Sequence, residues 1–164
     1  WPLLSSCSYA LQYFILTTNF ICMAQQRLPR GLRNNNPLNL RKSDNKWQGK
    51  VYPGTDKAFE QFENVLYGIR AAMVCMNTHI QRDHKARIRT TIKREITRWA
   101  PPSENNVQAY INAVCVEHDL TPDTIVDPSN KNVFCRILWH MAFHENGVEV
   151  PFNYFERAYD LWKK

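Results

Sequence analysis

The first 22 residues contain no lysine, arginine, aspartate or glutamate, so the formal net charge of +6 resides entirely in residues 23–164. A secretory signal peptide begins with a basic segment and ends at a small-residue cleavage site, and this segment has neither. Polar residues interrupt its apolar run, which argues against a stable membrane span. Because Met23 is typical of a natural start, we expect residues 1–22 to be an extension and residues 23–164 to form a single domain. A residual export segment and an additional helix are the alternatives for residues 1–22.

The sequence also lacks the cysteine patterns of disulfide and zinc frameworks. Its five cysteines include no Cys-x-x-Cys pair. Cys75, Cys115 and Cys135 lie among apolar neighbours, where a free cysteine behaves as a small hydrophobic residue. This usage is typical of a protein made in a reducing cytoplasm.

Motifs for metals, nucleotides and covalent catalysis are absent as well. His140 and His144 stand four residues apart, but a methionine follows the first histidine where zinc proteases have glutamate. The chain has no P-loop, no Gly-x-Ser-x-Gly elbow, no dinucleotide fingerprint and no Cys–His signature. We therefore expect neither a metal nor an organic cofactor.

Apolar residues that recur every three or four positions predict helices over most of the chain. These stripes cover residues 65–80, 88–99, 107–115 and 133–142, and a last helix is expected over residues 151–162. Two short segments, residues 46–52 and 58–62, flank a Pro-Gly pair and predict a β-hairpin. The expected fold class is mainly α with a small β-hairpin.

Boundary residues refine these helices. Two prolines at 101–102 should end the second helix, and Ser103 is placed to cap the third. Asp127 followed by Pro128 predicts the start of the long fourth helix, which should end before Gly147.

Glu145 is the candidate catalytic residue that the pattern itself indicates. The long helix has an apolar stripe that ends with Met141 and Ala142, and Glu145 continues that stripe. A carboxylate at the end of an apolar face, in a last turn where the helix dipole disfavours negative charge, is suited to act as a general acid. The alternative is a frayed helix end with a solvated side chain.

Residues 82–98 hold seven basic residues against two acidic ones. Such a cluster can bind an anionic polymer, either nucleic acid or the polyanions of a bacterial envelope. A solvated helix face is the alternative.

An asparagine-rich loop supplies candidate substrate-binding residues. Residues 30–45 contain three consecutive asparagines and a proline, a composition that stabilises turns. Asparagine side chains also offer a donor and an acceptor together, which matches the hydroxyl and N-acetyl groups of sugars.

These stretches together resemble a family of small phage- and prophage-encoded proteins described as virion structural or lysozyme-like proteins. The resemblance rests on an ordered set of motifs between residues 30 and 147, namely RGLRNNNPLNLR, KWQGK, AFEQFENVLYGIRA, WAPPSENN and a final HENG. It implies a lysozyme-like fold that acts on bacterial peptidoglycan. Leu38 departs from the family pattern, which has glycine at this place. If the loop needs a positive φ there, Leu38 strains or alters it.

A looser similarity relates residues 35–41, Trp47 and residues 59–62 to peptidoglycan glucosaminidases of the lysozyme superfamily. In those enzymes the catalytic glutamate ends a helix that precedes the loop, whereas the comparable helix of this chain comes last. The implied fold is therefore a circularly permuted lysozyme-like domain in which Glu145 faces the asparagine loop.

The main interpretation is a phage-derived enzyme that cleaves the glycan strands of peptidoglycan, acting from the virion or in the periplasm and cell wall. Glu145 would protonate the glycosidic oxygen. The residues expected to contact the sugar are Asn35, Asn36, Asn39, Trp47 and Tyr110. Possible second carboxylates are Glu104, Asp44 and Asp56, and Glu104 has a helix-capping role as its alternative. Hydrolysis by two carboxylates and lytic transglycosylation by one both stay open.

Two other functions are also open. The first is a non-catalytic virion structural protein that retains the fold and binds other virion proteins or glycan. The second, and the less favoured, is a nucleic-acid-binding module that works through residues 82–98.

Overall fold

The computed structural model describes residues 28–103, 106–117 and 119–164, so the extension expected at residues 1–22 lies outside the described residues. The described chain is mainly helical, as the sequence predicted. Its helices are α2 (Arg30–Arg33), α3 (Val65–Lys85), α4 (Ile92–Trp99), α5 (Val107–Val114), α6 (Lys131–Asn146) and α7 (Phe152–Lys163).

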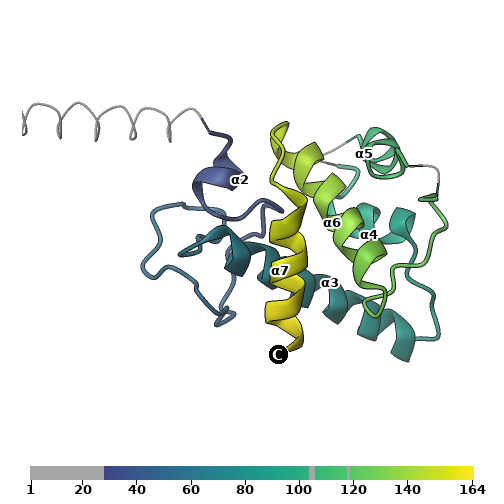
Figure 1. The fold of residues 1–164 in the computed structure, drawn as a ribbon, viewed down its shortest axis with the longest axis horizontal. Coiled ribbons are helices and arrows are strands. Elements are labelled where there is room, and N and C mark those ends of the chain that lie inside the picture. Colours follow the sequence, from purple (N-terminus) through teal and green to yellow (C-terminus); the bar gives the residue numbers. More distant parts are fainter. Residues whose placement is uncertain (1–27, 104–105, 118) are drawn as a thin grey trace, which may run out of the picture.

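The C-terminal helix α7 lies at the centre of the arrangement. It packs against α3 and α6, and α6 in turn packs against α5, which packs against α4. Figure 1 shows α7 crossing in front of α3, with α4, α5 and α6 on one side and α2 and the long loop before α3 on the other. The short helix α2 contacts α6, which brings the start of the described chain to the end of the long helix.

The core is built from the apolar stripes that the sequence predicted. The most deeply buried side chains of α3 and α6 have no exposed surface and include Ile69, Met73, Phe134, Leu138 and Met141. Burial of such side chains contributes about 1.5–3 kcal/mol each to folding. No helix in the described ranges is long and apolar enough to cross a membrane.

Two helices begin later than the boundary residues predicted. Ile88 is exposed, and α4 starts only after Thr91, whose hydroxyl oxygen accepts a hydrogen bond from the backbone N–H of Arg94. The chain before α4 is held extended by an antiparallel bridge between Thr91 and Ile125, so the helix cannot start earlier. Helix α5 is capped by Asn106 rather than by Ser103.

The long helix α6 also has a different cap from the one predicted. Asn130 caps it, because the carboxylate of Asp127 instead accepts hydrogen bonds from the backbone N–H and the hydroxyl of Ser129. The predicted end is confirmed: Gly147 follows the last turn with φ of 64°, a left-handed conformation that glycine adopts without steric cost.

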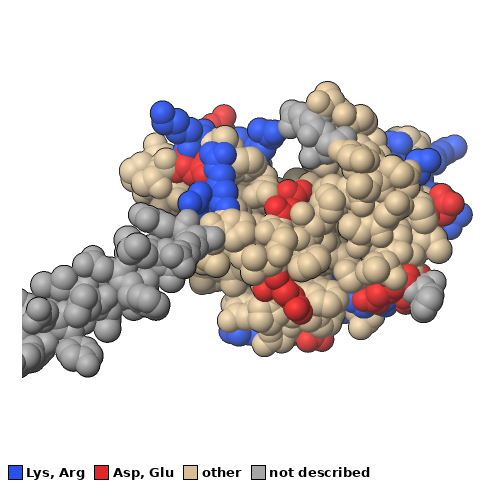
Figure 2. Space-filling model, turned by 90° about the horizontal axis from the view of Figure 1, so that it is seen from above, with Lys and Arg blue, Asp and Glu red and all other residues tan. Residues whose placement is uncertain are grey.

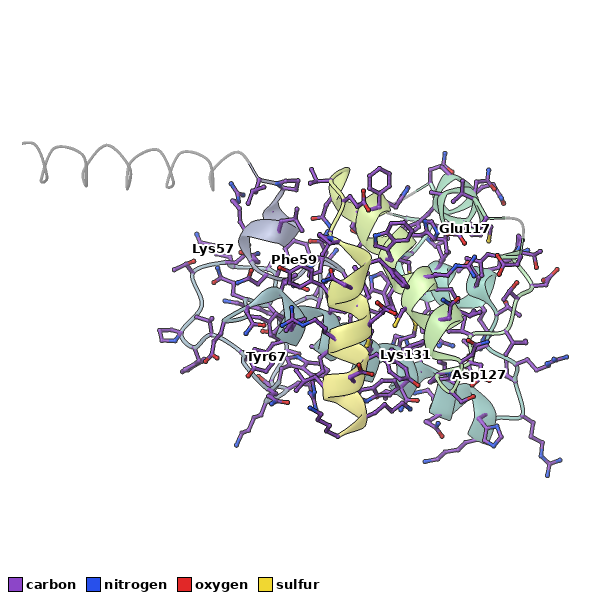
Figure 3. All side chains as sticks on the ribbon, in the orientation of Figure 1. Lys57, Phe59, Tyr67, Glu117, Asp127 and Lys131 are labelled. Carbon is purple, nitrogen blue, oxygen red and sulfur yellow. The ribbon has the colours of Figure 1, made fainter. Side chains whose placement is uncertain are left out.

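The two segments of the predicted β-hairpin pair antiparallel only through an isolated bridge, a second bridge joins the same region to the asparagine-rich loop, and the described residues contain no regular strand. Phe59 pairs with Arg41, whereas Phe62 pairs with Lys50. The segment from Phe59 to Phe62 therefore pairs at one end with the stretch at Arg41 and at the other end with the stretch at Lys50. Neither pairing continues into a regular β-ladder. In Figure 3, Phe59 lies on this loop side of the molecule, near α2.

Candidate functional site

Glu145 lies in the last turn of α6 and is half-buried. Its place follows from the sequence pattern, because the buried stripe of α6 runs through Met141 and Ala142 to this turn. The next residue, Asn146, donates a hydrogen bond of 2.7 Å from its side-chain amide to the carbonyl oxygen of Pro37. The end of α6 is therefore held against the asparagine-rich loop.

Two neutral donors bind the carboxylate of Glu145. The amide nitrogen of Asn39 donates to Oε2 over 2.8 Å, and the hydroxyl of Tyr110 donates to Oε1 over 2.9 Å. Asn39 has φ of 52°, a left-handed backbone conformation that asparagine tolerates better than most residues. The structure thus brings Glu145, Asn39 and Tyr110 together.

Tyr110 is almost completely buried and cannot readily lose its proton. Burial first, and then the charge of Glu145, raises the pKa of Tyr110 well above 10. The ring of His144 stacks on it with centroids 4.0 Å apart. Tyr110 therefore holds Glu145 as a permanent donor and has little surface left for contact with a substrate.

A cleft of about 430 Å³ opens beside Glu145. Its lining includes the loop residues Asn39 and Phe59, His79 of α3 and Trp99 of α4. This volume is within the usual range for small-ligand pockets. The indole N–H of Trp99 donates to the carbonyl oxygen of Leu38, which fixes the orientation of the ring at the edge of the cleft.

The remaining asparagines of the loop hold the loop itself. Asn36 is completely buried, and its amide nitrogen donates to the carbonyl oxygens of Leu40 and Glu60. Asn35 donates to the carbonyl oxygen of Phe62. Neither residue lines the cleft, so of the three asparagines expected at a sugar only Asn39 reaches it.

Trp47 is not brought to Glu145. Trp47 lines a separate pocket together with Asp44 and Tyr52. Glu104 lies outside the described residues. Asp56 is held by Arg30 in an ion pair of 2.7 Å and does not line the cleft either.

Leu38 does not strain the loop. It is completely buried in the core, and positive φ angles fall on Asn35 and Asn39 rather than on Leu38. The loop therefore uses a large apolar side chain at this position, and the left-handed residue is the one that follows.

Sequence reasoning missed a cluster of charged side chains that α3 and α4 contribute beside the cleft. His79 Nδ1 lies 2.6 Å from Glu95 Oε1, and Glu95 is almost fully buried. Arg98 donates to Glu95 and also to Asp83, whose pKa is lowered first by Arg94. The sequence does contain a signal for this cluster: Asp83 and Glu95 are the two acidic residues within the basic segment 82–98, so each has basic side chains nearby with which to pair.

The basic segment is thereby divided into two parts. Arg94 and Arg98 face buried carboxylates, whereas the other basic side chains of residues 82–98 are exposed. Figure 2 shows lysine and arginine side chains gathered toward both ends of the face seen there, with uncharged residues over most of the middle. Among the described residues, no group of three histidine, cysteine or carboxylate side chains could hold a metal ion.

Comparison with known proteins places this mainly helical chain among the proteins of bacterial viruses. It is 32% identical over 130 residues to Protein P5 of Pseudoalteromonas phage PM2, a match that spans 77% of this chain and 76% of that protein. The chain belongs to the family of this phage protein. No protein-family model matches it.

Proposed function

We propose that this protein is a structural component of a phage particle whose cleft binds the glycan strands of the bacterial cell wall. Its relationship to a phage protein over three quarters of both chains supports the phage origin. The observation that carries the glycan proposal is the pairing of Asn39 with Glu145 at the cleft.

The cleft offers the chemistry that a sugar needs. Asn39 and Glu145 provide an amide and a carboxylate, which bind hydroxyl and N-acetyl groups. Trp99 provides apolar ring surface at the cleft, whereas the ring of Phe59 already packs against the guanidinium groups of Arg30 and Arg41. A saccharide in the cleft would exchange hydrogen bonds with the polar pair and pack an apolar face on the ring of Trp99.

Glycan cleavage through Glu145 is the second candidate function. Glu145 is the sole carboxylate among the described residues that line the cleft, so the one-carboxylate route suits the cleft better than the two-carboxylate route. A protonated Glu145 would give its proton to the glycosidic oxygen as the bond to the anomeric carbon breaks. A hydroxyl of the same sugar would attack that carbon and return its proton to Glu145, leaving an anhydro end.

The test compares the parent chain with Glu145→Gln on purified peptidoglycan. Glu149→Gln is the matched control, because Glu149 is exposed and lies four residues farther along the chain. Binding is measured by co-sedimentation, and released fragments are identified by mass spectrometry. Binding without release by any of the three proteins supports the structural role, whereas release that Glu145→Gln abolishes and Glu149→Gln preserves supports cleavage.

Two outcomes count against these proposals. Absence of both binding and release, with all three proteins folded, removes the glycan proposal. Equal release by the parent and by Glu145→Gln removes Glu145 as the acid. The structural role is tested separately by mass spectrometry of purified particles of a phage that encodes the chain, and absence of the protein from those particles contradicts it.

A further inference from the structure

Three side chains on the α3–α4 wall of the cleft form a chain of contacts. Cys75 Sγ lies 3.8 Å from His79 Nε2, and Nδ1 of the same ring lies 2.6 Å from Glu95 Oε1. Cys75 and His79 line the cleft. We propose that these three residues form a second reactive centre, in which the thiol of Cys75 accepts an acyl group from an amide or ester carbonyl. This proposal does not rest on glycan binding.

The arrangement has the order that nucleophilic catalysis requires: a nucleophile, a base within reach of it, and a third group that orients the base. Cys75 and His79 lie one turn apart on α3, so their side chains share a helix face. Glu95 comes from α4 and is 1% exposed. Arg98 Nη1 donates to its other oxygen over 3.1 Å, which keeps Glu95 from turning away from His79.

His79 places a positive charge beside the thiol of Cys75. The pKa of His79 is raised to about 9, first by its hydrogen bond with Cys75 and then by its hydrogen bond with Glu95. His79 is therefore protonated at neutral pH. A positive charge beside a cysteine favours the thiolate, which is the nucleophile.

The other described cysteines provide a comparison within the same molecule. Cys135 is buried, and burial raises its pKa to about 12. Cys115 is half-buried, and burial also raises its pKa. Neither lines the cleft, whereas Cys75, which is also half-buried, does line it.

The reaction balances without an oxidant or a metal as co-reactant. The thiolate of Cys75 attacks the carbonyl carbon, and a carbon–sulfur bond forms as the bond to the amine or alcohol breaks. His79 gives its Nε2 proton to that leaving group. Water then attacks the thioester and gives a proton to His79. The carbon–sulfur bond breaks, which releases a carboxylic acid and restores the thiolate and the imidazolium.

Glu95 acts in this scheme as a positioning residue, because it touches His79 and not the acyl group. Its carboxylate fixes the ring with Nε2 toward Cys75 and stabilises the imidazolium. A purely structural Glu95 would affect stability without changing how the reaction depends on pH. Glu95→Gln should instead shift the pH profile of Cys75 reactivity.

The experiment exposes the full chain at pH 7 to p-nitrophenyl acetate, an activated ester. Release of nitrophenolate is followed by absorbance, and the acetylated cysteine is located by peptide mapping. We expect acetylation of Cys75 to be at least about tenfold faster than that of Cys115. His79→Gln should lower the acetylation rate of Cys75 to that of Cys115, and Cys115→Ser should leave the rate of Cys75 unchanged.

The opposite results overturn the proposal. Acetylation of Cys75 no faster than that of Cys115 shows that the thiol is not activated. An unchanged Cys75 rate in His79→Gln shows that the imidazole plays no part. Because the comparison between cysteines uses the parent protein alone, it remains decisive even where Glu95→Gln does not fold. Glycan binding by Cys75→Ser, measured in parallel, separates this centre from the site at Glu145.

Discussion

Asn39 donates a hydrogen bond of 2.8 Å from its side-chain amide to the carboxylate of Glu145, although 106 residues separate the two in the sequence. The contact joins the asparagine-rich loop to the last turn of α6 at the edge of the cleft. It is the feature that relates the fold to the proposed glycan site, because each partner alone is an ordinary loop residue or helix end.

Replacement of Asn39 by alanine tests this contact directly. We expect Asn39→Ala to weaken glycan binding by about tenfold, because it removes the amide proposed to bind the sugar, and one hydrogen bond contributes about 0.5–1.5 kcal/mol. Asn153→Ala, at an exposed position of α7, is the matched control and should bind as the parent does. Co-sedimentation with peptidoglycan measures both, and equal binding by the two variants contradicts the assignment of Asn39.

The hydroxyl of Tyr110 should stabilise the protein through Glu145. Tyr110→Phe removes the donor but keeps the buried ring and its stacking on His144, so we expect the free energy of unfolding to fall by about 1–2 kcal/mol. Tyr52→Phe is the control, because Tyr52 is 89% exposed. Urea unfolding followed by circular dichroism measures both variants. A change no larger than that of the control would show that the hydroxyl contributes nothing.

The raised pKa of His79 predicts a pH dependence of stability. A histidine whose folded pKa is about 9, above its usual 6.5, stabilises the fold fully below 6.5 and loses this effect as the pH rises through 9. The difference in unfolding free energy between the parent and His79→Gln should therefore be largest near pH 6 and shrink by about pH 10.

Histidine resonances in NMR spectra provide the direct measurement. His140 is the internal reference, because burial lowers its pKa below 6.5. A pKa above 6.5 for His79 and a pKa below 6.5 for His140 would agree with the contacts of His79 and the burial of His140. Titration of His79 at or below 6.5 is the result that excludes its ion pair with Glu95.

Leu38 should tolerate glycine poorly, although the resemblance found in the sequence implies a glycine at this place. Leu38→Gly empties a completely buried site, so we expect a loss of about 3–5 kcal/mol in the free energy of unfolding. Leu28→Gly is the control, because Leu28 is 40% exposed. Unchanged or increased stability in Leu38→Gly would mean that the loop does require a glycine there.

Helix periodicity was the reliable part of the sequence. The stripes of α3 and α6 are confirmed because the face that a helical residue occupies depends only on its position along the helix. The start sites were less predictable. Asp127 and Asn130 are both good caps, and the choice of Asn130 depends on a bond that Asp127 makes to Ser129 instead.

The pairing of the β segments is the part of the fold that the sequence predicted least well. The residues around Phe59 have the composition of a strand, and the sequence predicted that they pair with one neighbouring segment. In the structure this region pairs both with Lys50 of the neighbouring segment and with Arg41 of the asparagine-rich loop. Pairing partners depend on tertiary packing, which strand composition does not encode.

The sequence by itself determined the mainly helical fold and the position of Glu145 at the end of an apolar stripe, because both follow from local helical geometry. Only the tertiary structure decided which groups meet there. It selected Asn39 rather than Asn36 as the partner of Glu145, added Tyr110, and brought His79 to Glu95 across two helices. These contacts depend on how distant segments pack, and periodicity specifies a face of a helix without specifying what that face will touch.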